Sequence, residues 1–117
     1  MTDYTDLIVW QRGMLLAESI YEITAHFPKE EQFGLISQMR RAAVSIPSNI
    51  AEGHGRGNKK EFVYFLRVAR GSAAEIQTQL LLSARLSFFD LEQAQHLQNQ
   101  YDEIKRMLGA MIIKLEK

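Results

Sequence analysis

The chain has 117 residues, no cysteine, and 14 positive and 14 negative side chains. The absence of cysteine excludes disulfides, thiolate metal sites and thiol nucleophiles. No apolar run reaches the roughly 18 residues of a membrane-spanning helix, and no secretory signal pattern precedes residue 10, so we expect one domain over residues 1–117, located in the cytoplasm with no membrane association.

The charge is distributed unevenly along the chain. Residues 38–72 carry seven cations and two anions, whereas residues 1–37 have a net charge of −4 and residues 73–117 a net charge of −1. The seven cations are Arg40, Arg41, Arg56, Lys59, Lys60, Arg67 and Arg70. This concentration of positive charge predicts an anionic partner. The alternative is that the arginines form ion pairs with glutamates of neighbouring helices.

The first of four predicted helices runs from about Asp6 to His26. It ends at Phe27-Pro28 because the residue before a proline avoids helical backbone. Apolar residues alternate three and four positions apart, which is typical of a helix packed against neighbours. The predicted core positions are Leu7, Trp10, Met14, Ala17, Tyr21 and Thr24. Further apolar residues widen this face, so we expect it to contact more than one helix.

The second predicted helix begins at Pro28, which suits the first helical position. Pro47 falls within its apolar pattern and removes one backbone hydrogen bond, so a kink is expected there, the alternative being a break into two helices at Ile46. Gly53 is predicted to end the helix in the left-handed conformation. The predicted core positions are Leu35 or Ile36, Met39, Ala43, Ile46 and Ile50.

Residues 53–57 contain three glycines and connect the second helix to the third. Glycine-rich loops can bind phosphate, but here the loop follows a helix and lacks the GK[ST] sequence, so a plain turn is favoured. Asn58 caps the third helix, with Glu61 in a capping box, and the helix runs to about Leu86. The predicted core positions are Phe62, Phe65, Leu66, Ala69, Ala73, Ile76, Leu80 and Ala84.

Gly71 lies in the middle of the third helix, where glycine costs about 1 kcal/mol relative to alanine. We expect a close contact at this position, either between helices or between subunits. The fourth helix begins at Asp90, and its predicted core positions are Ala94, Leu97, Tyr101, Ile104, Leu108, Met111 and Leu115. Four helices with short connections predict an all-α, up-down-up-down four-helix bundle.

Two segments, FPKEEQFGLISQMRRAAVSIPSNIAEGHGR and KEFVYFLRVARGSAAE, resemble the bacterial four-helix bundle family encoded by intervening sequences of large-subunit ribosomal RNA genes. The resemblance extends from Leu7 to Leu115 and is most specific from Gly34 to Glu75. In this chain the family motif falls on Arg40, Arg41, Ala42, Ser45, Pro47, Asn49, Ala51, Glu52, Gly53 and Arg56, and then on Phe65, Leu66, Ala69, Arg70, Gly71, Ser72 and Glu75. His54 departs from the pattern.

The resemblance implies a ring-like homopentamer of bundles that associates with nucleic acid. A related branch is the accessory protein of diversity-generating retroelements. In that branch the ring binds RNA and a reverse transcriptase, which implies a nucleic-acid enzyme as a partner here. Ordinary members of the family have no established activity.

A hydrolytic site is the first alternative function. Ser45, Ser48 and Glu52 share one helical stripe, and His54 follows in the loop. A catalytic triad needs a nucleophile beside a base together with oxyanion donors, and the flank of a bundle offers no such pocket. We therefore interpret these side chains as hydrogen-bonding partners of one another and of the backbone around Pro47, with Asn49 and Arg70 in the same network.

Metal binding and base stacking are two further alternatives. His26 and His96 are expected at the same end of the bundle, but two histidines without a carboxylate cluster make a poor metal site. Exposed aromatic rings can stack on the bases of single strands. The candidates are Trp10, Phe62, Tyr64 and Phe65. Helical spacing assigns most of them to the core and leaves Tyr64, between Lys60 and Arg67, as the open candidate.

The sequence therefore predicts an oligomeric protein, not an enzyme, without cofactor or metal, that binds RNA, DNA or a nucleoprotein through a basic surface of the second and third helices. Arg56, Lys59 and Lys60 are the preferred contacts, and Arg41, Arg67 and Arg70 are expected to be mainly structural. The predicted structural motif comprises Ser45, Pro47, Asn49, Glu52, Gly53, Gly71 and Glu75. The alternative is a protein-binding scaffold whose cations form ion pairs between subunits.

Overall fold

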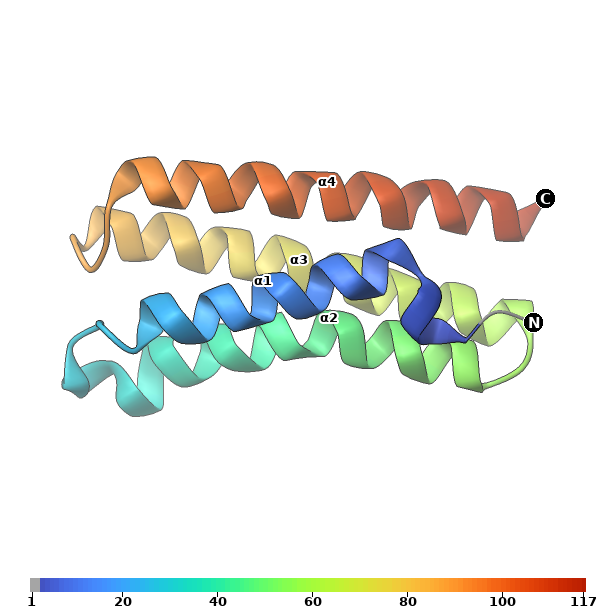
Figure 1. Ribbon diagram of the computed structural model, residues 1–117, viewed down its shortest axis with the longest axis horizontal. Coiled ribbons are helices and arrows are strands. Elements are labelled where there is room, and N and C mark those ends of the chain that lie inside the picture. The colour runs from blue at the N-terminus through green and yellow to red at the C-terminus, as the bar shows by residue number, and fades with distance from the viewer. Residues whose placement is uncertain (1–2) are drawn as a thin grey trace.

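A computed structural model describes residues 3–117 and contains a bundle of four antiparallel helices measuring 44 × 23 × 20 Å (Figure 1). The helices are α1 (Ile8–Thr24), α2 (Ser37–Gly55), α3 (Lys59–Arg85) and α4 (Leu91–Glu116). Each helix runs opposite to the one before it, so the α2–α3 loop lies at the same end of the bundle as both chain termini (Figure 1). The predicted all-α, up-down-up-down four-helix bundle is confirmed.

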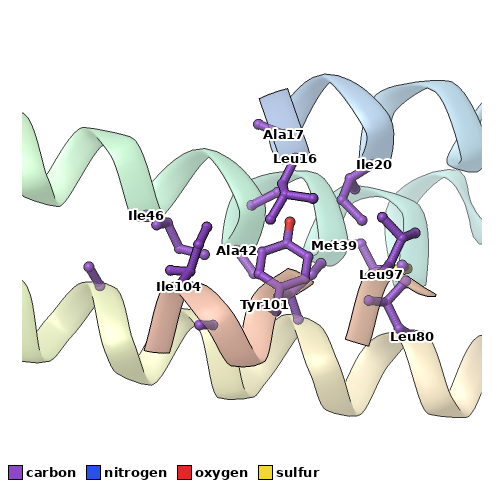
Figure 2. Close-up of a cluster of buried hydrophobic side chains, with 14 of the residues drawn as sticks. Leu16, Ala17, Ile20, Met39, Ala42, Ile46, Leu80, Leu97, Tyr101 and Ile104 are labelled. Carbon is purple, nitrogen blue, oxygen red and sulfur yellow. The ribbon is translucent and has the colours of Figure 1, made fainter. Parts of the chain in front are cut away.

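One continuous core of buried apolar side chains joins the four helices. Tyr101 of α4 lies in this core, with Leu16 of α1 and Met39 of α2 around it (Figure 2). The predicted core positions of the second helix are all buried. Most predicted core positions on the third and fourth helices are buried as well. The exceptions are half-buried, namely Phe62, Phe65, Ala84, Met111 and Leu115.

The face that α1 buries matches the predicted one only in part, since the predicted core positions Ala17 and Thr24 are buried. Val9, Leu16 and Ile20 face the core, whereas the predicted core residues Met14 and Tyr21 are exposed. Both stripes are apolar and have helical spacing, so periodicity alone does not distinguish them. The bundle buries the stripe with Val9, Leu16 and Ile20. The stripe with Met14 and Tyr21 stays exposed beside α2.

The start of the second helix is also corrected. Pro28 has extended backbone angles and precedes a 3₁₀ turn, η2 (Lys29–Glu31), which is followed by a π-helical turn, η3 (Gln32–Ile36). Gly34 has φ −110° and ψ −110°, outside the helical region, so regular helix begins only at Ser37. The side chain of Glu31 accepts a hydrogen bond from the backbone N–H of Leu35 at 3.2 Å, in place of a backbone acceptor.

The end of α2 differs from the prediction as well. Gly53 is buried inside the helix, which continues to Gly55, and the left-handed residue is Gly57, with φ 82°. Gly53 is therefore not a cap. The predicted kink at Pro47 is not confirmed, and the alternative of a break into two helices at Ile46 is wrong, because α2 runs through both residues as a single helix. A Cβ atom added at Gly13 of α1 would lie 3.4 Å from the ring of Pro47, so the proline packs where α1 and α2 approach closely.

None of the helices in the described part of the chain is long and apolar enough to span a membrane.

The buried hydroxyl of Tyr101 provides a test of the core. The residue is fully buried, and its hydroxyl has no hydrogen-bond partner among the described residues. Replacing Tyr101 by phenylalanine should raise the free energy of unfolding by about 1 kcal/mol, because an unpaired buried polar group carries a desolvation cost. Urea denaturation followed by circular dichroism at pH 7 measures this change.

The same variant should change the alkaline behaviour of the protein. Burial raises the pKa of Tyr101, so above about pH 10 the unfolded chain releases this proton while the folded chain retains it. The wild type should therefore lose stability with rising pH more steeply than the phenylalanine variant does. A variant that is less stable than the wild type at pH 7 would show that the hydroxyl has a stabilising partner.

Candidate nucleic-acid interface

The seven cations of residues 38–72 occupy separate regions rather than one surface. Arg40 and Arg41 lie in the first turns of α2, whereas Arg56 directly follows its last turn. At 1.5 Å per residue, about 22 Å of helix separates Arg41 from Arg56. The other four cations lie in the first half of α3, in the order Lys59, Lys60, Arg67 and Arg70.

Arg40 connects α2 to α1. Its Nε donates a hydrogen bond to Thr24 Oγ1 at 2.9 Å, and its terminal nitrogen donates to the carbonyl oxygen of Tyr21 at 3.3 Å. The guanidinium also lies over the Tyr21 ring, 4.5 Å from the ring centroid. Three contacts with one neighbouring helix make Arg40 a structural residue. Arg41 beside it is exposed and forms no ion pair among the described residues.

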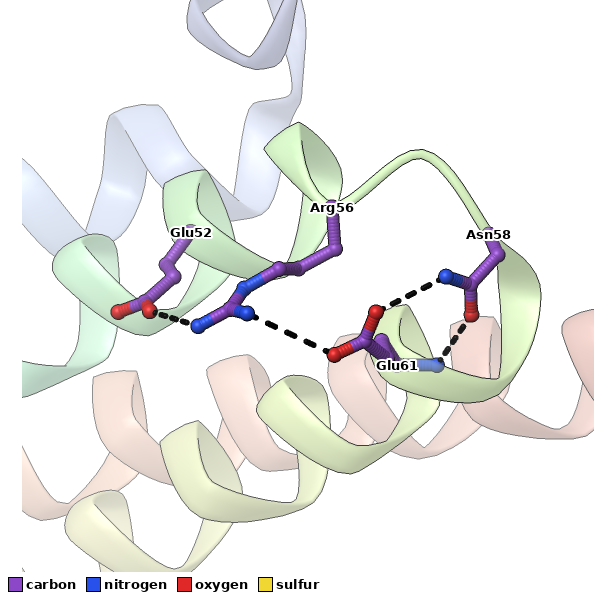
Figure 3. Close-up of polar contacts among 4 residues, drawn as sticks. All are labelled: Glu52, Arg56, Asn58 and Glu61. Atoms are coloured by element: carbon purple, nitrogen blue, oxygen red, sulfur yellow. Dashed lines mark hydrogen bonds and ion pairs between the residues drawn. The ribbon is translucent and has the colours of Figure 1, made fainter.

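Arg56 joins the end of α2 to the start of α3 (Figure 3). Its guanidinium donates to the carboxylate of Glu52 at 2.7 Å, lies 3.7 Å from the carboxylate of Glu61, and sits 5.1 Å from the ring centroid of Phe65. Asn58 caps α3 as predicted, because its side-chain oxygen accepts from the backbone N–H of Glu61 at 2.9 Å. The capping residue and the arginine thus share one glutamate.

The charge of Arg56 is therefore offset where it lies. The hydrogen bond to Glu52 raises the pKa of Arg56, and two carboxylates lie beside the guanidinium, whose positive charge they offset. The pairs are exposed and contribute little to stability. They join the end of α2 to the start of α3 across the loop. Arg56, a preferred contact from the sequence, is thus less available to an anionic partner than the lysines beside it.

Arg67 and Arg70 both reach toward α4. Arg67 pairs with the carboxylate of Glu116 at 2.7 Å, and both side chains remain about half exposed. A terminal nitrogen of Arg70 lies near the backbone of Gly109, 3.7 Å from the position of an added Cβ atom. Arg67 is thus a connection between helices, as the ion-pair alternative predicted, although within one chain.

Lys59 and Lys60 are exposed and form no ion pair within residues 3–117. They lie at a groove between the start of α3 and the end of α4, with a volume of about 490 Å³, hereafter the α3–α4 groove. Its lining residues are Lys59, Lys60, Val63, Tyr64, Arg67, Leu115 and Glu116. The structure thus brings together three of the seven cations and the one aromatic residue that the sequence left open.

Two lysines near this groove were missed by the sequence reasoning. Lys114 and Lys117 flank Leu115 and Glu116 in sequence and are exposed at the same end of the bundle. Counting charge in windows along the chain assigned them to the acidic C-terminal third. The up-down topology, which places the end of the fourth helix beside the start of the third, is the signal that would have found them.

A small polar network holds α2 against α3. The hydroxyls of Ser45 and Ser72 lie 2.9 Å apart, and the side-chain amide of Asn49 donates to the backbone oxygen and hydroxyl of Ser45 at 2.7 and 2.8 Å. Glu75, farther along α3, accepts from the amide of Gln79 at 3.4 Å. Of the predicted network only the contact between Ser45 and Asn49 is present, and the hydroxyl of Ser45 pairs with Ser72 of α3. Glu52 instead pairs with Arg56.

The two motif glycines differ in their surroundings. A Cβ atom added at Gly53 would lie 2.7 Å from Cβ of Phe65 and 3.1 Å from a ring carbon of Phe62, so only glycine fits between α2 and α3. Gly71 has no neighbouring atom within 4 Å of such a Cβ atom. The predicted contact between helices at Gly71 is therefore wrong, and a contact between subunits stays a prediction.

A second groove runs along the outer face of α1 and α2, with a volume of about 620 Å³, hereafter the α1–α2 groove. It contains the apolar stripe that α1 does not bury, including Met14 and Tyr21, and the exposed Val44 of α2. Glu18 and Glu22 add negative charge at its side. This surface is apolar enough to be covered by another protein surface.

The alternative catalytic and metal sites do not form among the described residues. The ring of His54 lies between those of Tyr4 and Phe62, with centroid distances of 6.5 and 5.7 Å, and no hydrogen bond joins it to Ser45 or Ser48. Residues 3–117 also contain no group of three or more histidine, aspartate or glutamate side chains placed to hold a metal ion.

Comparison with known proteins gives a family. The model of the 23S rRNA-intervening sequence protein family matches residues 5–110. The chain belongs to this family. A member of the S23 ribosomal protein family from Bacteroides thetaiotaomicron, a protein with unknown function, has a crystal structure that matches with a TM-score of 0.80 and 25% sequence identity. The match covers 90% of this chain and 98% of the other. No functionally curated protein matches the chain.

Several residues of the motif that the sequence resemblance suggested have a structural role. Gly53, Ser45 and Asn49 are motif residues that lie at the contact of α2 with α3, and Pro47 lies at the contact of α2 with α1. Motif residues of this intervening-sequence protein therefore maintain the spacing of helices. None of the residues that line the α3–α4 groove belongs to this motif. Among them the sequence singled out Lys59, Lys60 and Arg67 by their charge and Tyr64 as a candidate for base stacking.

Proposed function

We propose that this intervening-sequence protein is a non-enzymatic oligomer that binds nucleic acid, mainly through phosphates, at the end of the bundle that carries the α2–α3 loop. The observation that carries the proposal is the pair Lys59 and Lys60, which are exposed, adjacent and without an ion pair among the described residues. Exposed lysines are among the side chains that contact the phosphates of nucleic acids. Lys114 and Lys117 add positive charge at the same end.

Salt dependence tests the proposal directly. Binding of labelled RNA and duplex DNA should weaken with rising salt, because each phosphate contact releases counterions. In a variant with Lys59→Ala and Lys60→Ala, the slope of log K against log salt on duplex DNA should decrease in magnitude by about 2, which is roughly 0.9 for each lost contact. Fluorescence anisotropy across a salt series measures both slopes. Arg56 is left unchanged, since it joins the end of α2 to the start of α3.

A matched control removes two cations from the opposite end. Lys29 and Arg85 are exposed and form no ion pair within the described residues, so Lys29→Ala with Arg85→Ala changes the net charge equally. The control variant should retain the wild-type slope. Equal losses in the two variants would show that net charge alone attracts the nucleic acid, and no binding at low salt would favour the protein-scaffold alternative.

Self-association is a second proposed property, and the α1–α2 groove supports it. A ring uses two different surfaces of each subunit, so one apolar surface must meet another. The groove supplies one of them, and exposed leucines at the end of α3 supply a candidate for the other, namely Leu81, Leu82 and Leu86. Five subunits is the number that the family resemblance implies, and light scattering after size exclusion measures it.

A further inference from the structure

Tyr64 is a large aromatic residue that the fold leaves uncovered. It lies on α3 with 61% of its surface exposed, outside the core cluster. Within the described part of the chain its aromatic neighbour is Phe65, with ring centroids 5.1 Å apart and an interplanar angle of 85°. Such an edge-to-face contact restrains the Tyr64 ring while most of its surface remains accessible to a ligand.

The surroundings of Tyr64 combine positive charge with apolar surface. Lys60 and Arg67 lie four residues before and three residues after it, so the three side chains share one stripe of α3. All three line the α3–α4 groove, in which Val63 and Leu115 provide apolar surface. Glu116 is the one anion in the groove, and Arg67 pairs with it at 2.7 Å.

We propose that the α3–α4 groove binds single-stranded nucleic acid, with a base stacked on Tyr64 and the neighbouring phosphates on Lys59 and Lys60. This inference rests on the proposed function and specifies its ligand. Surfaces that bind single strands combine cations along the backbone path with aromatic rings on which bases stack. In a duplex each base is already stacked and paired, so it cannot cover the ring. An acidic peptide would use the lysines and leave the ring unused.

The test compares one oligonucleotide sequence as a single strand and as a duplex of the same length, by fluorescence anisotropy at low salt. Wild-type protein should prefer the single strand. Tyr64→Ala should weaken single-strand binding at least about fivefold, the effect of losing one stacked base, and should leave duplex binding unchanged. Tyr64→Phe should retain the wild-type affinity because it keeps the ring. A 2-aminopurine base in the strand should be quenched on binding to the wild type and not to Tyr64→Ala.

Phe33→Ala is the matched control, since Phe33 is 90% exposed and lies at the opposite end of the bundle. It should bind like the wild type. If Tyr64→Ala binds both the single strand and the duplex as tightly as the wild type does, the inference is overturned while the proposed function stands. An equal loss for single strand and duplex would overturn stacking as well. Tighter binding of an oligoglutamate than of the single strand, or no binding of either nucleic acid, would overturn the proposed function itself.

Discussion

Replacing Gly53 by alanine should lower the free energy of unfolding by about 1–3 kcal/mol, the usual range for overpacking a well-packed core. The added methyl carbon would lie 2.7 Å from Cβ of Phe65, an atom that is fixed to the backbone of α3 and cannot rotate away. The helices must therefore separate at this point. Urea denaturation of the purified protein, followed by circular dichroism at 222 nm, measures the loss.

Gly71 provides the matched control on the facing helix. An added Cβ atom there has no neighbour within 4 Å, so Gly71→Ala should stabilise the folded chain by about 1 kcal/mol through helix propensity. Changes of opposite sign in the free energy of unfolding would show that Gly53 is needed for close packing, whereas at Gly71 only the backbone flexibility of glycine matters. Equal stability of Gly53→Ala and the wild type would show that α2 and α3 can move apart without cost. Weaker self-association of Gly71→Ala would place this glycine at a subunit contact.

Replacing Val44 by glutamate should convert the proposed oligomer into monomers. Val44 is 41% exposed and lines the α1–α2 groove, so the isolated subunit can solvate the new carboxylate. Under a second subunit the charge would be buried without a partner, which costs about 3–5 kcal/mol for each interface. Glu18 and Glu22 in the same groove add repulsion. Subunit affinity should therefore fall more than a hundredfold, as measured by light scattering over a dilution series.

Ile113→Glu controls for the loss of an exposed apolar side chain. Ile113 lies on α4 and is 62% exposed, and it does not line the α1–α2 groove. This variant should keep the oligomer mass of the wild type. If Ile113→Glu dissociates into monomers while Val44→Glu remains an oligomer, the subunit interface lies on α4 rather than at the α1–α2 groove. A monomeric wild type at micromolar concentration would remove self-association from the proposal.

Local patterns in the sequence determined the bundle itself. Each helix shows apolar residues at helical spacing, and the Asn58 cap and the glycines after Gly53 mark the turn between α2 and α3. These signals act within one or two turns of the chain, so they can be recognised without knowing the neighbouring helices. Helix boundaries were less certain, since Gly34 breaks the regular pattern before α2 by its backbone angles alone.

Tertiary contacts decided which cations of the candidate interface remain without an ion pair among the described residues. The sequence identified a basic segment but did not distinguish Arg56, held between two glutamates, from Lys59 and Lys60, which have no ion pair in the described chain. It also did not place the end of α4 in the same groove. The partner Glu116 is 49 residues from Arg67, and such a pairing depends on how α3 and α4 pack.

Packing between helices likewise decided the roles of the glycines and of the two apolar stripes. On α1, the stripes through Leu16 and Met14 are equivalent by periodicity, and only contact with the other helices determines which is buried. The sequence predicted a helix end at Gly53 and a close contact at Gly71, yet Gly53 lies against Phe65 and a Cβ atom added at Gly71 has no neighbour within 4 Å. Helical spacing is a property of one segment, whereas burial and close approach depend on the position of a second helix, and for this chain only the tertiary structure supplied that position.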